Sequence, residues 1–214
     1  GTRAGTSLIH DFSNEGIVNL NLLSASKMVA LPPIAPEAHS NAVIFLGFDV
    51  EHGVELWRSE GTPETTYMIT ELETGVDDLQ LDQMVAHGDK VYFSATTTVQ
   101  GEELWYTQGT VETTFMLPPI GSNEAGGNIS QLTSTENGLF FSALSNDTAH
   151  RLTSNNTVVE LVSPDANDAI QDVATFTAVG DKVVFIGETN AQGEELFSYD
   201  ALTEAVVLLA DLEA

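Results

Sequence analysis

The residues of this sequence best suited to chemistry are carboxylates, and they are abundant. The chain of 214 residues has 32 acidic and 6 basic side chains. A pair of carboxylates hydrolyses a glycosidic bond when one acts as the acid and the other as the base or nucleophile. Here the carboxylates are so frequent that no pair stands out, and no neighbouring motif assigns a role to any of them. The sequence therefore predicts no catalytic residue.

Other reactive residue types lack the spacing that chemistry requires. The chain has no cysteine, which excludes thiol catalysis, cysteine-ligated zinc and disulfides. No G-x-S-x-G elbow, phosphate-binding loop or dinucleotide fingerprint is present. The histidines show neither H-x-x-x-H nor HExxH spacing, so they predict no zinc site. The five histidines are His10, His39, His52, His87 and His150.

Two oxygen-rich loops are candidates for binding calcium. Asp11, Ser13 and Glu15 alternate along the chain and precede Gly16. This spacing is typical of the first half of a calcium loop, although the closing bidentate glutamate is missing. The same residue types favour turns without any metal, so both interpretations stay open. In the second loop, the candidate ligands are Asp165, Asn167, Asp168 and Asp172. We expect no cofactor other than calcium.

The charge of the chain excludes one class of partner. A formal net charge of −26 would repel a phosphate backbone, and no cluster of basic residues is present to bind one, so we expect no nucleic-acid binding. The same charge favours unfolding through self-repulsion, which salt or divalent cations would relieve. No run of 18 apolar residues occurs, so we expect no insertion into a membrane.

The elements that would position any site follow from an internal repeat. The stretch VELWRSEGTPETTYMI (54–69) recurs as EELWYTQGTVETTFML (102–117) and, less clearly, as EELFSYDALTEAVVLL (194–209). Trp57 and Trp105 are thus equivalent, and the spacing predicts Leu152 and Phe197 as the next equivalents. A second phrase keeps the same period, as HGDKVYFSA (87–95), ENGLFFSAL (136–144) and VGDKVVFIG (179–187). Two phrases in step indicate repeats of about 45–48 residues.

Each repeat has the pattern of four short strands. Apolar residues alternate with polar ones over five to seven positions, and Gly, Asp and Asn punctuate them, as in antiparallel β-structure. One four-stranded sheet cannot bury both of its faces, so the sheets must stack, as the blades of a β-propeller do. We predict an all-β, β-propeller-like array with at least fourteen strands and less than about a tenth helix, against a usual share near a third.

The predicted organisation is a single repeat-built domain, 1–214, from a larger protein. An additional N-terminal strand is expected at residues 6–12. The predicted blades are 17–72, 79–120, 128–164 and 170–212.

The repeated phrase is predicted to be structural. Its aromatic residues would fill the space between successive sheets, so we expect Trp57 and Trp105 to be mostly buried. Its glycines would allow the backbone to turn between the third and fourth strands. The residues assigned to this structural motif are Glu55, Leu56, Trp57, Gly61, Thr62, Glu103, Leu104, Trp105, Gly109, Thr110, Glu195, Leu196 and Phe197.

The phrase also resembles a known family. ELWRSEGTPETT and ELWYTQGTVETT are similar to the ELW-x-x-DGT-x-x-GT repeat of large secreted and surface-attached bacterial proteins, and GTRAGTSLIHDF matches the second half of that repeat. Glu60 and Gln108 stand where the family has Asp. The resemblance implies a propeller-like β-array and an extracellular or cell-surface setting, and it names no ligand.

Two functions fit these observations. The first is a non-catalytic binding or structural module of a secreted or cell-surface protein, engaged in adhesion or in binding a protein or glycan partner. The alternative is a polysaccharide-active propeller enzyme that uses carboxylates in its central channel. The regular repeat and the lack of a reaction motif favour the module. The oligomeric state stays open at this point.

Overall fold

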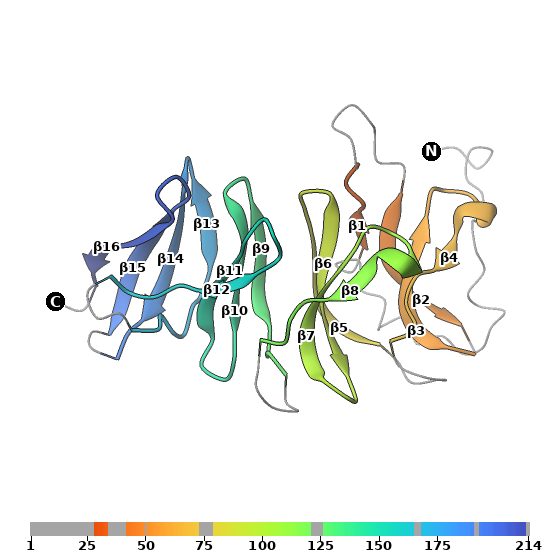
Figure 1. Cartoon of the computed structure of the whole chain (residues 1–214), viewed down its shortest axis with the longest axis horizontal. Coiled ribbons are helices and arrows are strands. Elements are labelled where there is room, and N and C mark those ends of the chain that lie inside the picture. Colours follow the sequence, from red (N-terminus) through yellow and green to blue (C-terminus); the bar gives the residue numbers. More distant parts are fainter. Residues whose placement is uncertain are drawn as a thin grey trace. The chain divides into compact units, whose positions relative to one another are not determined.

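A computed structural model describes residues 28–33, 42–49, 51–72, 79–120, 126–164, 168–190 and 193–212 (Figure 1). The described residues form sixteen strands in four sheets, each antiparallel and four-stranded. Their helices are two 3-10 turns, η5 (Pro63–Thr65) and η6 (Val111–Thr113). The prediction of an all-β, β-propeller-like array is confirmed. None of the helices in these residues has the length and hydropathy needed to cross a membrane.

The strands of each sheet lie side by side in the order in which they occur along the chain. The first sheet contains β1 (Met28–Ala30), β2 (Val43–Asp49), β3 (Gly53–Ser59) and β4 (Tyr67–Met68). The second contains β5 (Gln80–His87), β6 (Lys90–Thr97), β7 (Gly101–Thr107) and β8 (Thr114–Met116). The third contains β9 (Ser130–Thr135), β10 (Gly138–Ala143), β11 (Thr148–Leu152) and β12 (Val158–Glu160). The fourth contains β13 (Phe176–Val179), β14 (Lys182–Glu188), β15 (Glu194–Asp200) and β16 (Ala205–Asp211).

The strands of each sheet fall inside one of the predicted repeats. The strand predicted at residues 6–12 lies outside the described residues. By their contacts, the residues group into two compact units, Gly1–Thr98 with Trp105–Phe115, and Val99–Leu104 with Met116–Ala214.

Two-residue turns explain why the first and second strands of a sheet pair in register. His87 lies opposite Lys90 in the second sheet, and Val179 lies opposite Lys182 in the fourth. Gly88 and Gly180 begin these turns with φ of +61° and +59°, which glycine adopts without strain. Turns of this length favour residues with positive φ because their twist matches that of the strands.

Each unit has its own apolar core. In the first unit, Ile44, Leu46 and Leu56 of the first sheet pack with Val91 and Phe93 of the second. In the second unit, the core joins the third and fourth sheets. Its buried members are Phe140, Ala149, Leu161, Ile170, Val173, Phe176, Val183, Phe185, Phe197 and Tyr199. The faces of two sheets thus meet within each unit, as stacking of repeats requires.

Candidate functional site

The Gly-Thr segment of the repeated phrase forms a hydrogen-bonded turn between the third and fourth strands. In the first sheet, the Ser59 and Thr66 hydroxyls lie 2.7 Å apart, and the Gly61 N–H donates to Ser59 Oγ at 3.0 Å. The Thr66 hydroxyl also donates to the Thr62 carbonyl at 2.7 Å. These bonds close the chain around η5 and fix the entry into β4.

The second sheet repeats the same network. The Thr107 and Thr114 hydroxyls lie 2.8 Å apart, and the Gly109 N–H donates to Thr107 Oγ1 at 2.9 Å. The Thr114 hydroxyl donates to the Thr110 carbonyl at 2.8 Å. Because the bonds of both copies remain within the turn, the Gly-Thr segment serves to shape the backbone.

The two glycines of these turns give a matched stability test. Gly61 and Gly109 both have φ of +94°, a conformation that strains any residue with a Cβ. A Cβ at Gly61 would meet nothing within 4 Å, whereas a Cβ at Gly109 would lie 2.7 Å from Leu31 Cδ2. We expect Gly61→Ala to cost about 1–3 kcal/mol from strain, and Gly109→Ala to cost more because a contact must also shift. Denaturant unfolding of both variants checks the order. Equal costs would show that the Leu31 side chain moves aside without a loss of stability.

The glutamates that begin the repeated phrase are buried. Glu55, Glu103 and Glu195 occupy equivalent places at the third strand of the first, second and fourth sheets. The Thr70 hydroxyl donates to Glu55 Oε2 at 2.6 Å and accepts the Leu56 N–H at 2.8 Å. These bonds hold the segment after β4 against β3.

In the second sheet, backbone amides take the place of the threonine hydroxyl. The Ile120 N–H donates to Glu103 Oε2 at 3.1 Å, and the Ile129 N–H donates to Glu102 Oε2 at 3.2 Å. Burial raises the pKa of Glu103, and the Ile120 amide opposes that shift by stabilising the carboxylate. The glutamates that accept these bonds therefore tie the connection between repeats to the sheet.

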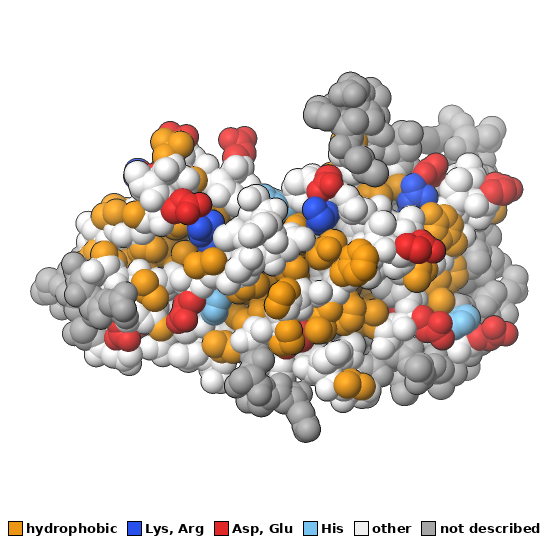
Figure 2. Space-filling model, viewed as in Figure 1, with side chains coloured by type: hydrophobic (Ala, Val, Ile, Leu, Met, Phe, Trp, Pro, Cys, Tyr) orange, Lys and Arg blue, Asp and Glu red, His pale blue; other side chains and the backbone are white. Residues whose placement is uncertain are grey.

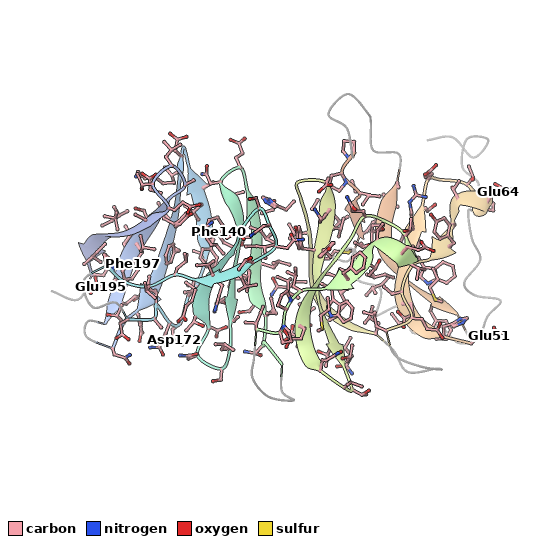
Figure 3. The ribbon with its side chains drawn as sticks, in the orientation of Figure 1. Glu51, Glu64, Phe140, Asp172, Glu195 and Phe197 are labelled. Carbon is pink, nitrogen blue, oxygen red and sulfur yellow. The ribbon has the colours of Figure 1, made fainter. Side chains whose placement is uncertain are left out.

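Aromatic rings pair across the second and third strands of the sheets. Trp105 stacks on Phe93, with ring centroids 6.4 Å apart, and Phe197 stacks on Phe185 at 5.8 Å. Phe197 is buried in the fourth sheet (Figure 3). Trp57 is buried as well, whereas Trp105 is half-buried against the core of the first unit. Leu56 and Leu104 are buried, and Leu196 is half-buried.

The structure corrects one equivalence in the third sheet. The spacing predicts Leu152 in the place of Trp57. Trp57 lies opposite Phe45, and the equivalent Phe197 lies opposite Phe185. In the third sheet, the residue opposite the equivalent Phe141 is His150 and not Leu152. The rings of His150 and Phe141 stack at 5.5 Å with an interplanar angle of 9°. His150 is buried and bonds through Nδ1 to the Thr148 carbonyl at 2.8 Å. Burial lowers the pKa of His150.

The outer strands of the first unit carry exposed aromatic residues at equivalent positions. Tyr67 on β4 is 38 % exposed and Phe115 on β8 is 49 % exposed. The Arg58 guanidinium lies 5.7 Å from the centre of the Tyr67 ring, and Arg58 Nη1 donates to the Tyr67 hydroxyl at 2.9 Å. Lys90 lies 5.6 Å from the centre of the Tyr106 ring, which contacts Phe115. Figure 2 shows apolar side chains at the surface, with acidic ones scattered among them. Aromatic rings accompanied by cations are a surface feature that the sequence motifs do not indicate.

The candidate calcium ligands fall mainly outside the described residues, which exclude Asp11, Ser13, Glu15, Asp165 and Asn167. Asp168 accepts hydrogen bonds from Asn190 Nδ2 at 3.0 and 3.1 Å. Asp172 has φ of +49°, and its N–H donates to the Asn146 carbonyl at 3.0 Å, which is turn geometry. In the part of the chain that the structure describes, no three His, Asp or Glu residues lie close enough together to hold a metal ion.

A melting experiment separates specific calcium binding from screening. With a net charge of −26, added sodium chloride should raise the melting temperature by weakening carboxylate repulsion. Calcium at matched ionic strength should raise it further only if a loop binds the ion in the native state alone. We expect the two shifts to be close, because the loops lack a closing bidentate carboxylate. A calcium shift well above that of matched salt, reversed by chelator, would contradict this expectation.

Comparison with known proteins gives similarity at the level of fold. No protein-family model matches the chain, and no curated protein matches it. A puromycin hydrolase structure has a TM-score of 0.54 at 15 % identity over 83 % of this chain. A structure from a study of two prolyl endopeptidases has a TM-score of 0.53 at 9 % identity over 80 % of it. A puromycin-hydrolyzing peptidase of Mycobacterium tuberculosis has a TM-score of 0.50 at 16 % identity over 84 % of it.

The chain spans 28 %, 25 % and 29 % of the lengths of these three proteins. It therefore corresponds to less than a third of each. Identities this low show the fold alone. The chain is thus a β-propeller-like array of four-stranded antiparallel sheets, similar in fold to a part of these larger proteins.

Proposed function

We propose that this chain is a non-catalytic binding or structural module of a secreted or cell-surface bacterial protein. The observation that carries the proposal is the use of the repeated polar residues. The hydroxyls of the two Gly-Thr turns bond within their own turn, and Glu55 and Glu103 accept bonds from the connecting segments. The resemblance of the phrase to repeats of secreted and surface-attached bacterial proteins supports the setting.

The surface that would bind a partner is the outer edge of the first unit. Tyr67 and Phe115 stand at equivalent places and present exposed rings. Arg58 lies over the Tyr67 ring, and Lys90 lies over the Tyr106 ring that contacts Phe115. Aromatic residues and arginine supply much of the binding energy at protein interfaces, because their large, rigid surfaces lose little entropy on binding. The flat faces of aromatic rings also suit the apolar faces of sugars, so a glycan is the second class of ligand.

A glycan array and a turnover screen on polysaccharides test the proposal together. We expect the chain to bind without turnover, and the double variant Tyr67→Ala/Phe115→Ala to lose binding. Val99→Ala/Val111→Ala is the matched control, because both valines are exposed apolar residues that do not belong to the aromatic pair. Circular dichroism should show the same fold in all of these proteins.

The same screen tests the alternative of a polysaccharide-active enzyme. Turnover of a polysaccharide by the folded chain would support a polysaccharide-active enzyme and contradict a non-catalytic module. Binding that the aromatic double variant retains in full would contradict the proposed surface.

A further inference from the structure

The fourth sheet has one face in the core of the second unit and a second apolar face that is incompletely covered. Val183 and Phe185 on β14 belong to the core, so Val184 and Ile186 point to the opposite face by the alternation of a strand. Val207 lies opposite Ser198, which lies opposite Val184, and it shares this second face. Val207 is 44 % exposed. At the rim, Val179 on β13 is 58 % exposed and Leu209 on β16 is 50 % exposed.

In the first sheet, the equivalent face is covered by the second sheet. Leu46 lies opposite Leu56 there, as Ile186 lies opposite Leu196 in the fourth sheet. Leu46 and Leu56 are buried against the second sheet, whereas Ile186 and Leu196 are half-buried. Equivalent positions are thus apolar in both sheets, but among the described residues of each unit only those of the first sheet are packed against another sheet. A β-sheet presenting such residues is stabilised by a second sheet on this face.

Charged residues mark the two ends of the uncovered face. Lys182, at the start of β14, lies 2.6 Å from Asp200 Oδ2 and forms an ion pair with it. At the other end of the hairpin, Glu188 lies opposite Glu194, and both are exposed. The end that carries the Lys182–Asp200 ion pair and the doubly acidic end are therefore separated by the apolar residues.

We propose that this face binds the same face of a second copy of the chain. A two-fold axis lying between the sheets and running across the strands would place the Lys182 end of one copy against the Glu188 and Glu194 end of its partner. An axis along the strands would instead bring the two acidic ends together, which repulsion opposes. The proposal does not depend on the binding role assigned to the first unit.

The size of the face sets the strength to expect. Three strands of seven residues at ~3.4 Å per residue and the shorter β13, in four rows ~4.8 Å apart, lie within about 24 by 19 Å. Two such faces have a combined flat area of roughly 900 Å², which is below the ~1,200–2,000 Å² that stable interfaces bury. We therefore expect a dimer that dissociates in roughly the micromolar range or above. Repulsion between copies of charge −26 will weaken it at low ionic strength.

Sedimentation equilibrium between about 1 µM and 1 mM in moderate salt tests the proposal. The mass should rise from 22.9 kDa to twice that value as the concentration increases. Val207→Glu should remain monomeric, because a carboxylate would be buried in the apolar contact. Val99→Glu adds the same charge at an exposed turn and should dimerise as the wild type does. Circular dichroism must show that both variants are folded. A wild-type chain that is monomeric throughout, or a Val207→Glu variant that dimerises normally, would overturn the proposal.

Charge reversal tests the orientation. Lys182→Glu alone and Glu188→Lys/Glu194→Lys alone should each weaken the dimer, because each sets like charges together. An equimolar mixture of the two should form a heterodimer, since both ends are then complementary again. Failure of the mixture to associate more strongly than either variant would overturn the axis across the strands.

Discussion

Replacing Trp57 by alanine should lower the free energy of unfolding by about 3–5 kcal/mol, the usual cost of removing a buried aromatic side chain. Trp57 is buried on β3, and its ring lies over Gly47, where even a Cβ would be only 2.5 Å from Trp57 Cδ1. Gly47 has no side chain that could fill the space left by the ring, so truncation of Trp57 leaves a cavity. Urea unfolding followed by circular dichroism measures the loss.

Phe115→Ala is the matched control, since it removes an aromatic ring that is half exposed. Its cost should be about 1 kcal/mol, the scale of its contact with Tyr106. If Trp57→Ala cost no more than Phe115→Ala, the role of the repeated aromatic residue as a filler of the sheet packing would be contradicted. A lower dependence of the unfolding free energy on urea in either variant would indicate a change in the unfolded state instead.

The fold was predictable because two independent patterns agree. Alternating apolar residues specify strands, and the recurrence of Trp57 at Trp105 specifies that whole groups of strands repeat. Two-residue turns at Gly88 and Gly180 then fix the register locally, since positive φ is required there. Strand patterns and turns depend on short stretches of the chain, so they can be predicted directly from the sequence.

The third sheet shows where a fixed period fails. From Phe45 to Trp57 and from Phe185 to Phe197 the interval is twelve residues, but from Phe141 to His150 it is nine. The hairpin between β10 and β11 is shorter, so counting forward from Trp105 reached Leu152 instead. Register in a sheet is set by the turn and by the ladder of hydrogen bonds, which a constant period cannot follow through a deletion. Counting from Phe141 in the phrase ENGLFFSAL, and allowing for a shorter hairpin, would have indicated His150.

The buried glutamates show a different limit. The repeat predicts a structural role for Glu55 and Glu103, but glutamate is rarely buried unless a partner stabilises it. Their partners, Thr70 and Ile120, lie 15 and 17 residues further along the chain, in connecting segments with no repeated phrase of their own. Contacts between a motif and a variable segment depend on the folded path of the chain. They therefore could not be read from the repeat.

Replacing His150 by phenylalanine should remove a component of acid sensitivity from the protein. Burial lowers the pKa of His150 in the folded state, while in the unfolded chain the pKa should be near 6.5. As the pH falls through about 6.5, the unfolded chain gains a proton that the folded protein does not, so the wild type loses stability. This loss continues until the pH reaches the lowered pKa of the folded state. Phenylalanine keeps the stack on Phe141 and has no proton to gain.

The measurement is the difference in unfolding free energy between wild type and His150→Phe from pH 8 to pH 5. Taking the difference cancels the contribution of the many carboxylates, which both proteins share. Below about pH 6.5, the free energy of unfolding of the variant should rise relative to that of the wild type, by at most about 1.4 kcal/mol for each pH unit. Glu160 lies opposite His150 and raises its pKa, so Glu160→Gln should lower that pKa further and extend the loss to lower pH. A difference that stays constant with pH would show that His150 titrates alike in the folded and unfolded chains, and that its burial in the aromatic position has no electrostatic cost.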